Sequence, residues 1–138
     1  MAVPEALIEA YRKAEYVVFA ESPFVLRIGS PSPRLDAMLG EQGAHGAAFI
    51  TACNARGERR GAADNAAAMA ALMSALKRRR YACVAGEGRD PEGRWPAEPS
   101  VLVLAVPRDE AESLGRAFGQ NAIVYAARAA VPELVLLA

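Results

Sequence analysis

The chain has 138 residues, 53% of them hydrophobic, and its sixteen basic side chains balance sixteen acidic ones. This length and apolar content predict one globular domain over residues 1–138, because a chain of this size can bury a substantial core. Zero net charge disfavours a nucleic-acid binder, and the high hydrophobicity argues against disorder. There is no run of about 18 apolar residues and no visible signal peptide, so we expect a cytoplasmic protein without a membrane span.

Cysteine and histidine content limits the chemistry that the chain can perform. Cys53 and Cys83 are too few for a disulfide framework, and with the one histidine, His45, they do not form a zinc site. Both cysteines lie in apolar, strand-like runs, so we expect buried and poorly reactive thiols. These residues therefore indicate no metal site, and the sequence leaves any cofactor open.

The first half of the chain alternates helical and extended patterns. In chain order we expect a helix, a strand hairpin, a second helix and a third strand, over residues 4–14, 15–20 with 24–28, 32–43 and 47–53. The second helix has clear ends, since the Ser32 hydroxyl can cap it, Pro33 suits its first turn and Gly43 can terminate it. The polar stretch 54–63 contains Arg59 and two further arginines, and forms a loop that is either solvated or able to clamp an anion.

The second half opens with a long helix. Its apolar face carries Met69, Leu72, Met73 and Leu76 within residues 64–80. After it we expect a strand, an irregular stretch, a strand, a helix and two strands, over residues 81–85, 86–99, 101–106, 109–118, 122–126 and 134–137. The fifth strand is apolar throughout, which favours a central place in the sheet. Together these elements predict an α+β (mixed α/β) fold, with a single mixed sheet of about five to seven strands and about three to four packed helices.

The connections predict the direction of each strand. A helix between two strands normally returns the chain in the same direction, whereas a connection without a helix reverses it. The second, third and fourth strands should therefore end where the fifth and sixth begin. Ligand-binding candidates expected at this edge are Ser32, Asn54, Asn65, Trp95, Gln120 and Asn121. Such edges are common ligand sites in α/β proteins.

Three carboxylates before the fifth strand are candidate catalytic groups. Glu98 precedes an apolar strand, so partial burial would raise its pKa. Together with Glu87 or Asp90, it could act as a general base or hold a divalent metal ion. The alternative is a loop pinned by Trp95, in which the carboxylates bond to nearby arginines, since no histidine or cysteine accompanies them.

Four motifs of the sequence resemble those of a known family. They are Ile28-Gly29-Ser30-Pro31-Ser32, Phe49-Ile50-Thr51-Ala52, the stretch from Gly86 to Ser100 with its Asp90-Pro91 and Glu98-Pro99, and Phe118-Gly119-Gln120-Asn121-Ala122-Ile123. Together they resemble the bacterial domain-of-unknown-function family 3293, over residues 11–125. The family usually has Trp, Asn and Pro after its third strand, where this chain has Cys53, Asn54 and Ala55, which implies a looser or different pocket. The resemblance implies a small bacterial protein and brings no established activity.

Three functions remain open at this point. The first, which we expect, is a module that binds a small polar or anionic ligand, such as a nucleotide, with Trp95 stacking on it. The second is a small enzyme that uses Glu98 or Glu87 as general base, with or without a divalent metal. The third is a protein-interaction domain whose edge residues only hold their own loops. Converging carboxylates would favour the enzyme, and a closed pocket of amides would favour the binding module.

Overall fold

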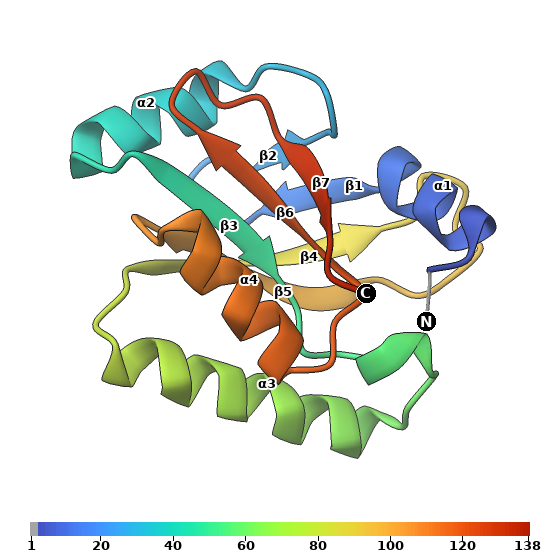
Figure 1. Ribbon diagram of the computed structural model, residues 1–138. Coiled ribbons are helices and arrows are strands. Elements are labelled where there is room, and N and C mark those ends of the chain that lie inside the picture. Colours follow the sequence, from blue (N-terminus) through green and yellow to red (C-terminus); the bar gives the residue numbers. More distant parts are fainter. Residues whose placement is uncertain (1–2) are drawn as a thin grey trace.

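Four helices pack against one curled, seven-stranded sheet in the computed structural model, which describes residues 3–138 (Figure 1). The helices are α1 (Glu5–Lys13), α2 (Pro33–Gln42), α3 (Ala62–Arg78) and α4 (Arg108–Ala117), with a 3₁₀ turn η1 (Ala55–Gly57). The strands are β1 (Glu15–Val18), β2 (Phe24–Leu26), β3 (Gly46–Ile50), β4 (Cys83–Arg89), β5 (Glu98–Leu104), β6 (Ala122–Ala127) and β7 (Glu133–Leu136). The predicted α+β class is confirmed. In this described part of the chain, no helix is long and apolar enough to cross a membrane.

The sheet has the predicted strand directions but different neighbours. Its order is β2-β1-β4-β5-β3-β6-β7, and every hydrogen-bonded pair is antiparallel. β2, β3 and β4 run one way and β1, β5 and β6 the other, as the connections predict. The parallel neighbours of a mixed sheet do not form, because the β4–β5 hairpin occupies the edge of β4 that β3 would otherwise use. β3 pairs instead with the outer edge of β5, which is the central strand.

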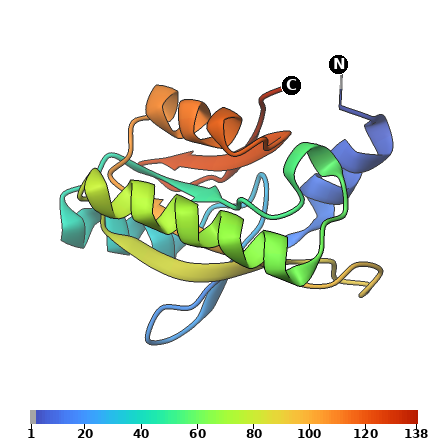
Figure 2. The same ribbon diagram turned by 90° about the horizontal axis from the view of Figure 1, so that it is seen from below.

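Two helices cover one face of the sheet. α3 and α4 lie side by side there (Figures 1 and 2) and bury Leu72, Leu76 and Leu114 against the strands. Met73, predicted on this apolar face, is 41% exposed instead. The reason is that the buried stripe of α3 turns toward Ala75, which leaves Met73 at the margin of the contact.

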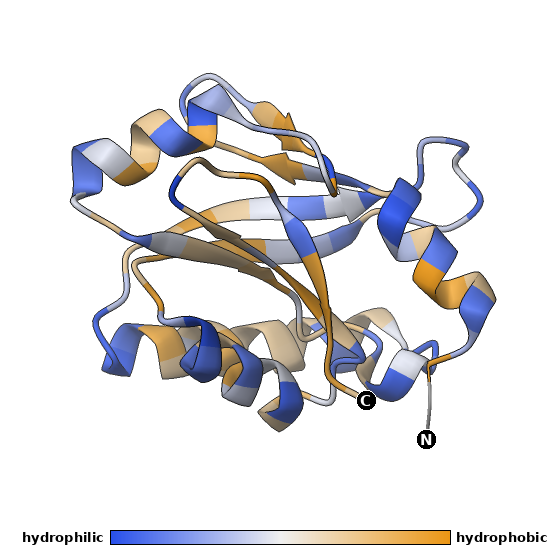
Figure 3. Ribbon diagram, turned by 45° about the horizontal axis from the view of Figure 1, so that its top comes forward, coloured by the Kyte–Doolittle hydropathy of each residue, from blue (hydrophilic) through white to orange (hydrophobic). Residues whose placement is uncertain are grey.

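The opposite face carries α2 at one end and α1 at the other. Leu35 and Leu39 of α2 are fully buried in the core of this α2 face. The ends of α2 follow the prediction: Ser32 Oγ accepts a hydrogen bond from Leu35 N at 3.2 Å, and Gly43 has a left-handed φ of 62°. Hydrophobic strand segments fill the space between α2 and the α3–α4 pair (Figure 3). By contrast, no residue of α1 is buried, so α1 covers its end of the face only loosely.

Candidate functional site

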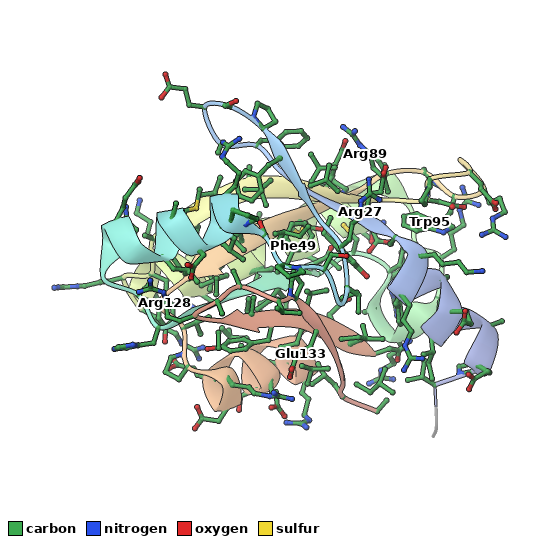
Figure 4. The ribbon with its side chains drawn as sticks, turned by 90° about the horizontal axis from the view of Figure 1, so that it is seen from above. Arg27, Phe49, Arg89, Trp95, Arg128 and Glu133 are labelled. Atoms are coloured by element: carbon green, nitrogen blue, oxygen red, sulfur yellow. The ribbon has the colours of Figure 1, made fainter. Side chains whose placement is uncertain are left out.

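A cavity of about 340 Å³ lies on the α2 face, beneath α1. It is placed at the end of the sheet where β3 and β4 finish and β1, β5 and β6 begin. Its wall is mainly apolar and includes Leu7, Phe49, Trp95 and Val124. Figure 4 shows Trp95 on the side of the molecule where α1 lies, with Phe49 nearer the middle. Gly88 leaves the space open, because a Cβ added there would meet no atom within 4 Å.

A network of amides reaches the cavity from the loop after β3. Asn54 Nδ2 donates a hydrogen bond to Glu98 Oε2 at 2.9 Å. Asn54 Oδ1 in turn accepts from Asn65 Nδ2 at 3.1 Å, and Asn65 Oδ1 accepts from the Asn54 backbone N at 2.8 Å. Asn54 has a left-handed φ of 49°, a conformation that asparagine tolerates better than most residues. The loop is thereby held with one amide hydrogen bond directed at a carboxylate.

Gln120 and Asn121 reach the cavity from the turn before β6. Gln120 Nε2 donates to the backbone oxygens of Cys53 and Phe118, each at 3.2 Å, so this side chain joins the two loops. Asn121 lines the cavity. A Cβ on Gly57 would lie 2.9 Å from Asn121 Nδ2, so the missing side chain at residue 57 makes room for the amide.

Glu98 is the acidic side chain of the cavity wall, and it is largely removed from water. Burial raises the pKa of its carboxyl group, while the hydrogen bond from Asn54 acts in the opposite direction. Burial also raises the pKa of Tyr11 on α1, where the Asn121 side chain lowers it and the Glu98 charge adds to the rise. Among residues 3–138, no arginine, lysine or histidine forms an ion pair with Glu98. The site thus presents a desolvated carboxylate without a cationic partner.

The other two carboxylates do not join Glu98. Glu87 pairs with Val17 across the sheet, on the face opposite Gly88, and its Oε1 accepts from Arg89 Nε at 2.6 Å. Asp90 is buried in a turn and accepts hydrogen bonds from the backbone N atoms of Glu92 and Arg94. Burial alone would raise the Asp90 pKa, but these hydrogen bonds and the Arg94 guanidinium hold it below its usual value. Within residues 3–138, no three His, Cys, Asp or Glu side chains are grouped to hold a metal ion.

Ser32 lies away from the cavity, against expectation. Its backbone N donates to Ala130 O at 2.9 Å, in the turn between β6 and β7. This turn is at the opposite end of β6 from Asn121. The segment after β2, at one edge of the sheet, reaches the turn before β7, at the other edge. Local sequence does not predict this contact between distant residues. Figure 4 shows Arg128 of the same turn close to α2.

Asn65 lines a neighbouring cavity of about 620 Å³, on the α3 side of the loop. Asn54 and Glu98 line both cavities, whereas Asn65 contributes to the second alone. Of the six expected ligand-binding residues, the structure brings four to the first cavity: Asn54, Trp95, Gln120 and Asn121.

Side chains of α1 are the part of the site that the sequence did not assign. Leu7, Ala10 and Tyr11 line the cavity together with Tyr16 of β1. The helical spacing of Leu7 and Tyr11 predicts an apolar face for this helix, but the same spacing would serve a filled core. Only the position of α1 over small residues of the sheet, such as Gly88, shows that this face borders a cavity.

Comparison with known proteins gives one match. A family model described as a protein of unknown function (DUF3293) matches residues 50–123, which is more than half of the chain. This span contains the motifs around Asp90 and Gln120. No curated protein and no solved structure matches the chain.

Proposed function

We propose that this chain, which belongs to the DUF3293 family of proteins of unknown function, binds a small polar molecule in the cavity beneath α1. The observation that carries the proposal is the state of Glu98. Its carboxylate lies in a mainly apolar cavity and accepts one hydrogen bond from residues 3–138, that from Asn54 Nδ2. A desolvated charge without a partner costs free energy, so a ligand that supplies the partner gains affinity.

The dimensions of the cavity support a ligand of metabolite size. Its volume of about 340 Å³ lies near the lower end of the range for small-molecule sites, which is about 300–1,000 Å³. This space suits one ring system with its substituents. Trp95, Phe49 and Tyr16 offer aromatic surface to the body of the ligand, and Asn121 offers an amide to its polar edge.

An anionic ligand, such as the phosphate of a nucleotide, has less support than a neutral polar one. Arg59 is the basic side chain of the cavity wall, and it is exposed to solvent. Glu98, which is half-buried, would repel an anion. A nucleobase would therefore suit the cavity better than the phosphate of the same nucleotide.

A second candidate function is acid–base catalysis in the same cavity. The observation that favours it is the raised pKa of Glu98, since a carboxylate whose pKa moves toward neutrality is a better general base. We do not assign this role to Glu87, because its side chain lies on the other face of the sheet. Turnover of a bound compound, absent in Glu98→Gln, would identify the protein as an enzyme.

The experiment is a thermal-shift screen on three proteins. Ring compounds with ammonium, hydroxyl, carboxylate or phosphate substituents are tested against the wild type, Gly88→Val and Gly61→Val. Valine at 88 enters the cavity, whereas valine at 61 enters open space outside it. A compound at a hundred times its Kd adds about 2.7 kcal/mol of stability. We expect hits that stabilise the wild type and Gly61→Val but not Gly88→Val; hits that persist in Gly88→Val would contradict the proposal.

A further inference from the structure

Three hydroxyl groups around the cavity, those of Thr51, Ser100 and Tyr16, have already used their hydrogens within the protein. Thr51 Oγ1 donates to Pro99 O at 2.7 Å, Ser100 Oγ donates to Glu98 O at 3.0 Å, and the Tyr16 hydroxyl donates to Tyr11 O at 2.5 Å. A hydroxyl has one hydrogen to donate, so these three groups can only accept further hydrogen bonds.

Gln120, too, can only accept further hydrogen bonds. Its amide nitrogen has two hydrogens, and both are directed at backbone oxygens, of Cys53 and Phe118. Its Oε1 receives no hydrogen bond from residues 3–138. Tyr11 and Asn121 interact through their side chains, yet each has both donating and accepting atoms, so they can serve either kind of ligand and do not decide between them.

The charge of the cavity points in the same direction. Glu98 Oε2 accepts from Asn54, while Glu98 Oε1 receives no hydrogen bond from the described residues. Arg59, the basic residue of the wall, is exposed, so its charge is screened by water. A cation that displaces water beside Glu98 would gain a charge-assisted hydrogen bond in a poorly hydrated place. The aromatic rings of Trp95 and Phe49 add surface that attracts cations.

We infer that the cavity selects organic cations, in which an ammonium, amidinium or guanidinium group is attached to an apolar body. This inference rests on the proposed function and specifies its ligand class. The donors of the cation meet the unused acceptors Glu98 Oε1 and Gln120 Oε1, and its body lies among the aromatic and aliphatic side chains under α1.

The test compares probes of one shape and three charges. Calorimetric titrations at pH 7.5 and low salt use 2-phenylethylamine and benzylguanidine as cations, 2-phenylethanol as the neutral analogue and 3-phenylpropionate as the anion. The two cations are expected to bind the wild type at least about tenfold more tightly than the alcohol, which corresponds to about 1.4 kcal/mol. The anion is expected to bind more weakly than the alcohol.

Two glutamates provide the matched variants. Glu98→Gln keeps the shape of the side chain and removes its charge, so it should abolish the preference for cations over the alcohol and lower the affinity for the cations more than that for the alcohol. Glu87→Gln makes the same substitution on the other face of the sheet and should change neither. Equal affinity of the cations for the wild type and Glu98→Gln would overturn the inference.

The remaining outcomes separate the inference from the proposed function. If the alcohol or the anion binds as tightly as the cations, and Gly88→Val abolishes this binding, the cavity is a ligand site and the inference about cations is wrong. If none of the probes binds the wild type, the inference is overturned, and the broader thermal-shift screen decides the proposed function. The comparison of charges in the wild type needs no variant, so a poorly folded Glu98→Gln would not prevent a decision.

Discussion

The two ends of the α2 face are built on the same sheet, yet one is packed and the other is hollow. At the packed end, α2 inserts Leu35 and Leu39, both 0% exposed. At the hollow end, the cavity wall includes the small residues Ala10, Ala14 and Gly88 beside the larger Leu7 and Tyr11 of α1. Side-chain size at a few inward positions thus decides whether a helix on a sheet produces a core or a cavity. Under the proposed function, the packed end contributes stability and the hollow end provides the binding site.

Two leucine substitutions, one at each end, test this difference in packing most strongly. Leu39→Ala should lower the free energy of unfolding by about 2–5 kcal/mol, because it leaves a void in a filled core. Leu7→Ala at the cavity should cost less than about 1 kcal/mol, because Leu7 is only half-buried and borders a hollow. Urea denaturation of both variants measures the difference. Equal losses would mean that α1 is packed as tightly as α2.

Gly86 and Gly88 mark the boundary between the packed and hollow ends, on the same face of β4. A Cβ at Gly86 would overlap the Val17 carbonyl oxygen and the Phe49 ring, whereas one at Gly88 meets nothing within 4 Å. Gly86→Ala should therefore destabilise the protein by about 1–3 kcal/mol, as overpacking does. Gly88→Ala should be neutral or slightly stabilising, since alanine loses less backbone entropy than glycine. A large loss in Gly88→Ala by thermal denaturation would show that no space exists there.

A third comparison sets Gln120, which joins two loops, against Asn121, which lines the cavity. Gln120→Ala removes the hydrogen bonds to the Cys53 and Phe118 carbonyls and should cost about 1–2 kcal/mol in the ligand-free protein. Asn121→Ala removes a side chain that lines the cavity and should change stability by less than about 0.5 kcal/mol. A larger loss for Asn121→Ala than for Gln120→Ala in denaturant titrations would mean that Asn121, and not Gln120, braces the loops.

Glu98 should make the unfolding free energy depend on pH, and this effect should be weaker than those above. Burial raises its pKa in the folded state above the unfolded value, so the folded protein binds the proton more tightly. The stability from this group is complete below the unfolded pKa and is lost as pH rises through the folded pKa. The unfolding free energy of the wild type minus that of Glu98→Gln should therefore fall as pH rises from acid to neutral. A difference that stays constant in denaturation from pH 4 to 7 would show that Glu98 is as hydrated in the folded state as in the unfolded one.

Much of the secondary structure could be predicted from local patterns. Ser32 and Gly43 bound α2 as predicted, because capping depends on residues within one turn. The seven strands form near their expected places, although β4 continues to Arg89, through a stretch predicted to be irregular. That extension depends on pairing with β1 and β5, and such pairing has no local signal.

The candidate site could be predicted in part. Asn54, Glu98, Gln120 and Asn121 gather at one end of the sheet because strand directions follow from the connections. Glu87 was also a candidate, but side chains alternate between the two faces of a strand, so a shift of one residue reverses its side. The pairing of β4 with its neighbours sets the register, and the register decides on which face the Glu87 side chain lies.

The kinds of element, their order and the direction of each strand could be inferred from the amino-acid sequence, because they depend on residues near one another in the chain. The three-dimensional structure was needed to show which strands are neighbours, that Ser32 lies far from Asn121, and that the face of α1 borders a cavity. The physical reason is that strand neighbours and helix docking arise from competition between distant apolar surfaces. The volume left between α1 and the sheet depends on the fit of side chains from opposite ends of the chain.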